Sequence, residues 1–320
     1  MKNLVRKENL LWLTLTIVIY AIVSFLISAR VITTYYQITL VTIGINIILA
    51  VSLNLIIGVC GQFSLGHAGF MCIGSYSAAI VLKYIPGYYG LIVGILVGLV
   101  ISGLVAFTIA LPTLRLRGDY LAIATLGFAE IIRVVINNMK ITNGAAGISN
   151  IPKLTSFGVL YFAIVVTLLV VVNFKRSAPG RACSSIKEDE IASEAMGINT
   201  TKYKIIAFVI GAILASVAGA LSATYFYFIK PSDFSFVKSI DILVIVVFGG
   251  MGSMTGSVIS GIVLGIINLI LQNYPNERMI VYSLVIIAIM VYKPGGLLKT
   301  NEFTFSGLFK RFSKKDEVAK

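Results

Sequence analysis

The sequence predicts an all-α protein, a polytopic bundle of eight to ten transmembrane helices with both termini in the cytoplasm. The first reason is composition: of 320 residues, 58% are hydrophobic and 12% are charged, whereas soluble domains are about half apolar and about a quarter charged. The second is that the apolar residues form long stretches without a charge, such as residues 31–82, and about 20 of them cross a bilayer. The third is an unequal distribution of lysine and arginine between the two sides. An ordinary soluble enzyme is excluded.

Breaking the charge-free stretches at glycines, prolines and polar clusters gives ten candidate spans. In chain order they are residues 11–29, 38–59, 66–84, 88–112, 119–136, 157–174, 205–228, 240–251, 255–272 and 279–293. The first follows Lys2, Arg6 and Lys7, as a signal-peptide core would, but its length of about 20 residues favours an uncleaved span. The eighth and tenth are short enough to be re-entrant, so the predicted count is eight to ten.

The basic residues fix the predicted orientation. With both termini inside, eighteen Lys and Arg side chains fall in cytoplasmic segments and seven in outer ones, in agreement with the positive-inside rule. The net charge of +13 then reflects topology, and binding to nucleic acid is not needed to explain it. Residues 1–298 are expected to form the transmembrane domain, with a cytoplasmic loop at about 175–204. Residues 299–320 form a basic tail rich in phenylalanine, which either contacts membrane lipid or is solvated.

Small residues recur at four-residue spacing in three of the spans. They are Gly90, Gly94 and Gly98 in the fourth, Gly211, Ala215 and Gly219 in the seventh, and Gly261 and Gly265 in the ninth. On a helix these positions share a face and allow another backbone to approach closely. They predict a tightly packed bundle.

Two glycine-rich segments, residues 58–66 and 249–256, follow the second and the eighth span. Glycine-rich breaks at corresponding places can mark an internal repeat and a transport path, although two short matches leave coincidence open. The second segment is not a phosphate-binding loop, because the pattern GxxxxGK[ST] occurs nowhere in the chain. The chain is therefore not expected to hydrolyse ATP by that route.

Glu130 and Arg133 are the two acid–base residues that stand well inside a predicted span. At spacing i and i+3 they are close enough to pair. Glu130 lies about 16 Å along its helix from Asp119, near the middle of the membrane. An ionisable group there is costly and indicates a translocation path. A buried structural ion pair is the alternative.

Gln62, Ser64 and His67 form a polar cluster at the start of the third span. A lone histidine without Cys, Asp or Glu neighbours is more often a hydrogen-bonded packing residue than a ligand. The three cysteines are scattered with no CxxC pair, which argues against a metal cluster and a disulfide framework. The sequence therefore assigns no catalytic residue, no metal and no cofactor.

The loop between the sixth and seventh spans contains an acidic segment. Ser185 and Glu188 match a capping box and Gly197 suits the C′ position, so one helix of about eleven residues is predicted. Its acids are Glu188, Asp189, Glu190 and Glu194, and Ile191 and Ala195 share one face. A short amphipathic helix between spans can dock in a groove of a partner. The density of acids in a loop flanked by bases favours docking over a solvated linker.

Several short motifs are spread from about residue 50 to residue 297. They are SLNLIIG at 52–58, GQFSLGHAGF at 61–70, LRLRGDYLAIATLGFAEIIR at 114–133, GRA at 180–182, IKEDEIA at 186–192, AMGIN at 195–199, VFGGMGS at 247–253 and KPGGL at 293–297. Taken together, they resemble the permease of branched-chain amino-acid ABC importers, LivM type.

The resemblance implies a heterodimer with a second, homologous permease subunit, two cytosolic ATPase subunits and an extracytoplasmic solute-binding protein, in a bacterial inner membrane. It also implies that residues 186–197 couple closure of the ATPases to reorientation of the spans, and that the chain itself is no enzyme. Branched-chain or other hydrophobic amino acids are the expected cargo, while urea and short amides remain open. The alternative is an ion-coupled secondary transporter using Glu130 and Asp241. Dependence on ATP rather than on an ion gradient separates the two.

Overall fold

The computed structural model of the chain describes residues 2–271 except 115 and 117, together with 274, 283–284, 287, 291–293 and 295–298, and the side chains from residue 14 onward. Regular structure in this part is helical, apart from an isolated antiparallel bridge between Ile148 and Ile229. Most of the predicted tenth span and the whole predicted tail lie outside the described residues. The predicted fold class, an all-α bundle of apolar helices, is confirmed.

The helices follow the predicted spans. They are α1 (Lys2–Ser28), α2 (Thr34–Asn54), the π-helical η1 (Leu55–Val59), α3 (His67–Tyr84), α4 (Tyr88–Thr113), α5 (Asp119–Asn138), the 3₁₀ turn η2 (Gly144–Ala146), α6 (Phe157–Arg176), α7 (Ala178–Glu188), α8 (Glu190–Ala195), α9 (Thr200–Phe226), the 3₁₀ turn η3 (Pro231–Phe234), α10 (Phe236–Gly249) and α11 (Met254–Ile270). Each of the first nine predicted spans coincides with one of these helices, and α2 and η1 together form the second. The largest difference is at α1, which begins nearer the N-terminus than predicted.

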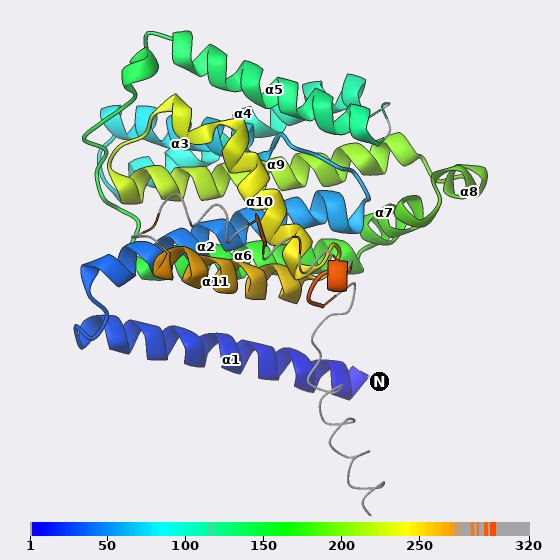
Figure 1. Ribbon diagram of the computed structural model, residues 1–320, viewed down its shortest axis with the longest axis horizontal. Helices are drawn as coiled ribbons and strands as arrows, with labels where there is room; N and C mark the ends of the chain where they lie inside the picture. The colour runs from blue at the N-terminus through cyan, green and yellow to red at the C-terminus, as the bar shows by residue number, and fades with distance from the viewer. Residues whose placement is uncertain are drawn as a thin grey trace, which may run out of the picture.

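The helices are stacked in layers, as Figure 1 shows. α5 lies on one face, α3, α4 and α9 lie beneath it, α2, α6 and α11 follow, and α1 lies on the opposite face. α10 runs steeply across the other helices. α7 and α8 project from one end of the bundle, which we call the inner end, and the N-terminus lies at that same end, as the predicted topology requires. That this end faces the cytoplasm stays a prediction from the basic residues.

Small residues allow the backbones of α3, α4 and α9 to approach one another closely. A Cβ on Gly94 would lie 2.8 Å from the Cα of Ala78, and one on Gly98 would lie 2.9 Å from the Oγ of Ser216. A Cβ on Gly219 would overlap a backbone carbonyl of α3. The small residues of α11 instead meet side chains of α2, since a Cβ on Gly261 would lie 2.9 Å from Cγ1 of Ile47. The predicted tight packing is confirmed in these helices, because a larger side chain would push the backbones apart.

After α2 and η1 the chain stays within the bundle through residues 60–66, which form neither helix nor strand and which we call the first break. Leu65 N donates to Thr125 Oγ1 at 3.0 Å, and Thr125 lies in the second turn of α5, about 9 Å from the start of that helix. α3 therefore begins inside the bundle, where His67 is 1% exposed. Ala68 N continues this contact by donating to a serine hydroxyl of α10 at 3.2 Å.

α10 and α11 are bent by 119° at residues 250–253, the second break. Asn54 of α2 binds this turn: its Oδ1 accepts from Gly252 N at 2.8 Å, and its Nδ2 donates to Ser253 O at 2.8 Å. A Cβ on Gly58 would overlap Gly252 N. The two glycine-rich segments predicted to resemble one another are therefore in contact. That they mark an internal repeat stays a prediction.

Four helices of the described part are long and apolar enough to span a membrane, namely α2 with η1, α4, α6 and α9, and the bent pair α10–α11 adds a fifth if it is one span. The most apolar stretches of α4 and α6 are 28% and 22% buried, against 83% for α2 with η1. α4 and α6 therefore present most of their apolar surface outward. The count of eight to ten spans stays a prediction.

Candidate functional site

The segment between α6 and α9 forms two short helices, and the predicted single helix is wrong. Ser177 caps α7 earlier than expected, because its Oγ accepts from a first-turn N–H at 3.3 Å. Asp189 interrupts the helix with extended backbone angles and caps α8, its Oδ1 accepting from Ala192 N at 3.0 Å. Ser185 does not cap a helix. It lies within α7, and its Oγ is 2.7 Å from that of Ser193.

Two lysines attach α7 and α8, which with the turn to residue 197 we call the platform, to the inner end of the bundle. Lys204 of α9 forms an ion pair with Glu190, with Nζ and Oε1 2.6 Å apart and the side chains 10% and 26% exposed. Lys187 Nζ donates to the carbonyl of Gly58 at 2.8 Å. Both contacts border an inner cavity of about 280 Å³. The platform is thus attached to η1 and to α9, so that it is part of the bundle rather than a loose loop.

The outward surface of the platform combines apolar and acidic side chains. Ile191 and Met196 are 69% and 82% exposed. The exposed members of the predicted coupling set are Glu188, Asp189, Glu194 and Gly197, the last with a φ of +84° as expected of a residue that ends a helix. Glu190, the remaining member, faces the bundle through its ion pair with Lys204. An apolar centre with an acidic rim suits docking to another protein.

Gln62, Ser64 and His67 lie along the first break, but within the described residues no hydrogen bond joins them. His67 Nε2 is 2.7 Å from Ser52 Oγ, and Ser64 Oγ accepts from Gly66 N at 3.4 Å. Gln62 is 2% exposed, lines the inner cavity, and has no hydrogen-bond partner for its amide within that part of the chain. The three residues of the predicted cluster are therefore not bonded to one another, and His67 is a packing residue whose ring contacts the Ser52 hydroxyl of α2.

Glu130 and Arg133 form the predicted pair on α5. The Nε of Arg133 donates to Oε2 of Glu130 at 2.7 Å, and the side chains are 30% and 31% exposed. Neither residue lines the inner cavity. The pairing is confirmed, and the role in a translocation path stays a prediction. Over the described residues, no group of three His, Cys, Asp or Glu side chains is placed to hold a metal ion.

The chain is similar to known transport proteins over most of its length. The family described as branched-chain amino acid transport system / permease component matches residues 35–292. The high-affinity branched-chain amino acid transport system permease protein LivM of Salmonella typhimurium is 35% identical over 293 residues, covering 79% of this chain and 68% of LivM. The corresponding protein LivH of Escherichia coli is 25% identical over 280 residues, covering 78% of this chain and 90% of LivH. A solved structure, PsaBC from Streptococcus pneumoniae in complex with Fab, matches with a TM-score of 0.44 and 16% identity, over 83% of this chain and 94% of that chain.

Proposed function

The chain belongs to the family of branched-chain amino acid transport permeases, and from this premise we propose that it is the membrane subunit of an ATP-driven importer for branched-chain or other apolar amino acids. The proposed cargo follows the names of its relatives, LivM and LivH, which are permease proteins of branched-chain amino acid transport systems. Its proposed location is the inner membrane of a bacterial cell, as a multi-pass protein.

The platform is the observation that carries the proposal of ATP-driven transport. A permease that does not hydrolyse ATP needs a rigid contact through which a partner can move it. Ile191 and Met196 provide an exposed apolar contact, and the acids around it provide charge. Lys187 and Lys204 connect the platform to η1 and α9. Movement of a bound ATPase would therefore be transmitted directly to two helices of the bundle.

The proposed assembly contains a second, related permease, two ATPase subunits at the inner end and a solute-binding protein at the outer end. The outward apolar surfaces of α4 and α6 leave room for contact with lipid and with a second permease. Similarity of one chain to both LivM and LivH supports pairing between related subunits. Purification of the tagged chain in mild detergent, with identification and stoichiometry of what accompanies it, tests this composition.

Uptake by the assembled importer in proteoliposomes tests the proposed energy source. We expect uptake of L-leucine to require ATP on the platform side and to continue when ionophores remove ion gradients. Uptake without ATP that follows a proton or sodium gradient would instead support an ion-coupled transporter using Glu130 and Asp241.

A pair of matched variants tests the platform. Ile191→Ser with Met196→Ser removes the exposed apolar contact, and we expect binding of the ATPase subunits to weaken about tenfold, as for loss of interface anchors. Met139→Ser is the control, because Met139 is 45% exposed and lies after α5, at the end of the bundle away from the platform. Equal ATPase binding and uptake in both variants would rule out this surface as the coupling contact.

A further inference from the structure

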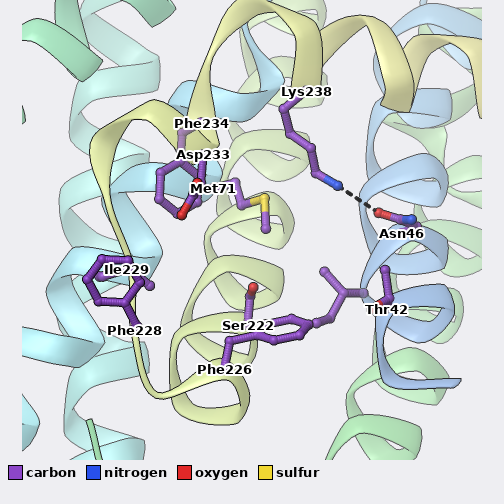
Figure 2. A pocket seen from close by; sticks show the side chains of 11 residues that line it. Thr42, Asn46, Met71, Ser222, Phe226, Phe228, Ile229, Asp233, Phe234 and Lys238 are labelled. Carbon is purple, nitrogen blue, oxygen red and sulfur yellow. Dashed lines mark hydrogen bonds between the residues drawn. The ribbon is translucent and has the colours of Figure 1, made fainter. Parts of the chain in front are cut away.

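A second cavity, of about 370 Å³, lies between α2, α3, α9 and the η3–α10 segment, and we call it the outer cavity (Figure 2). Its polar lining comprises Thr42, Asn46, Ser222, Asp233 and Lys238. Most of the remaining wall is apolar, including the side chains of Phe226, Phe228 and Phe234. The volume lies at the lower end of the range of about 300–1,000 Å³ that ligand pockets occupy. It suits a small solute.

Lys238 brings a positive charge to the middle of the bundle. Its Nζ donates to Oδ1 of Asn46 at 3.0 Å, as Figure 2 shows. Asn46 lies midway along the continuous helix Thr34–Val59, about 18 Å from either end. Asp241 lies about one turn further along α10, and it is exposed. A cationic side chain at this depth is costly and marks a functional position.

The positions at which α3 and α10 begin explain how polar groups come to lie near the middle of α2. α3 begins inside the bundle after the first break, and Ala68 N in its first turn donates to Ser239 Oγ at 3.2 Å. Ser239 directly follows Lys238 in the first turn of α10. The start of α10, the start of α3 and the middle of α2 therefore meet beside the outer cavity. Transport sites are commonly built from such discontinuous helices near the membrane midplane.

The outer cavity has charges of both signs on one short segment. Asp233 in η3 and Lys238 in α10 both line it. The Asp233 carboxylate is 45% exposed, with its Oδ1 3.8 Å from Lys230 Nζ, so it is accessible to a ligand. Figure 2 shows the Phe226 side chain extending from α9 toward Thr42 of α2. An anion-binding group, a cation-binding group and an aromatic wall are the three features that an apolar amino acid requires.

We propose that the outer cavity binds the amino-acid zwitterion during import, with Lys238 holding the carboxylate, Asp233 the ammonium group and the phenylalanines of the wall the apolar side chain. The inference rests on the proposed function and adds to it the place in this chain where the cargo is recognised.

Protection from alkylation tests binding directly. Thr42→Cys places a thiol on the cavity wall, and the native Cys60, Cys72 and Cys183 are buried, so a membrane-impermeant thiol reagent will report on the new residue in the assembled importer. We expect L-leucine at about ten times its dissociation constant to slow alkylation about tenfold. Tyr89→Cys is the control site, since Tyr89 is 83% exposed in the first turn of α4 and does not line the cavity. Its rate should not change.

Two variants and two leucine analogues separate the charges. In Lys238→Met, L-leucine should protect no better than isoamylamine, which lacks the carboxylate. In Asp233→Asn, L-leucine should protect no better than 4-methylpentanoate, which lacks the ammonium group. Asp233 is half-exposed, so the second variant remains informative if the first does not assemble.

The outcomes distinguish this inference from the proposed function. ATP-driven leucine uptake without protection of Thr42→Cys, or equal slowing at Thr42→Cys and Tyr89→Cys, would overturn the cavity assignment alone. Unchanged protection by L-leucine in both charge variants would do the same. Absence of ATP-driven leucine uptake in the complete assembly would overturn the proposed function on which the inference rests.

Discussion

The two glycine-rich breaks are alike in composition but differ in geometry. The first, residues 60–66, forms neither helix nor strand and leads into the bundle, so that α3 starts at the buried His67. The second, residues 250–253, is a tight turn in which Gly250 and Gly252 have φ of +111° and +102°. Glycine marks where a helix ends in both cases, but it does not decide the direction in which the chain continues.

The polar partners of the two breaks account for the difference. Around the first, side chains of separate helices make single contacts: Ser52 with His67, Thr125 with Leu65 N, and Ser239 with Ala68 N. At the second, the single side chain of Asn54 contacts Gly252 N, Ser253 O and Ser257 Oγ, and Lys175 Nζ adds one hydrogen bond to Gly252 O at 2.8 Å. The contacts of the first break are therefore distributed over three side chains, whereas most contacts of the second are concentrated on Asn54. Mutation of Asn54 should consequently have a larger effect than mutation of any one partner of the first break.

The largest effect is expected from Asn54→Ala. It removes three hydrogen bonds at a residue that is 0% exposed and leaves the buried Gly252 N–H without its acceptor, so the free energy of unfolding should fall by about 3 kcal/mol. Thermal unfolding in detergent measures this. Asn138→Ala is the control, because the Asn138 amide is exposed and bonds within its own helix to Val134 O. Similar small losses in both variants would show that the second break is not held by Asn54.

An intermediate effect is expected from Gly58→Ala. The new Cβ would overlap Asn54 Oδ1 and would lie 2.8 Å from the Cα of Gly252, so η1 must move away from the second break at a cost of about 2 kcal/mol. Gly127→Ala is the matched control, since nothing lies within 4 Å of its Cβ position and alanine favours the helix by about 1 kcal/mol. A Gly58→Ala protein as stable as the wild type would contradict the close contact between η1 and the second break.

The smallest effect is expected from Thr125→Val, which keeps the shape of the side chain but removes the acceptor of Leu65 N. The loss should be about 1 kcal/mol and should appear as faster hydrogen exchange in the first break. Thr108→Val is the control, because the bonds of that hydroxyl to the described residues stay within α4, at Leu104 O and Val105 O. If Thr125→Val destabilises the protein more than Asn54→Ala, the contrast between distributed and concentrated contacts is wrong.

The spans and the breaks could be predicted from sequence because their signals are local. Charge-free runs show where helices lie, and glycine clusters at 58–66 and 249–256 show where they end. The small-residue stripes also identified real helix contacts, as at Gly94 and Gly219. In each case the residues that give the sequence pattern are the same residues that form the helix, the break or the contact.

The platform and the outer cavity were harder to predict from sequence. In the platform, several residues compete to cap the helices, and in the outer cavity the contacts join residues far apart in sequence. Several residues in this segment can cap a helix. The structure uses Ser177 to cap α7 and Asp189 to cap α8, rather than Ser185. The hydrogen bond between Asn46 and Lys238 joins positions 192 apart in sequence. A sequence signal for these contacts did exist. Asn46 and Asn54 both lie within a charge-free run, and a polar amide in such a run needs a buried partner.

The backbone contacts of α3, α4 and α9 have a mechanical consequence. A Cβ on Gly74 would lie 2.6 Å from the Cα of Ser216, which also meets Gly98, so these helices have no room to slide past one another. We therefore expect these three helices to move as one rigid body. α9 has 27 residues and is about 40 Å long, so a tilt of about 5° at the platform would displace its far end by about 3.5 Å. α9 thus connects the platform to the outer cavity, because its ion pair with Glu190 lies near one end and Phe226 of the outer cavity lies at the other.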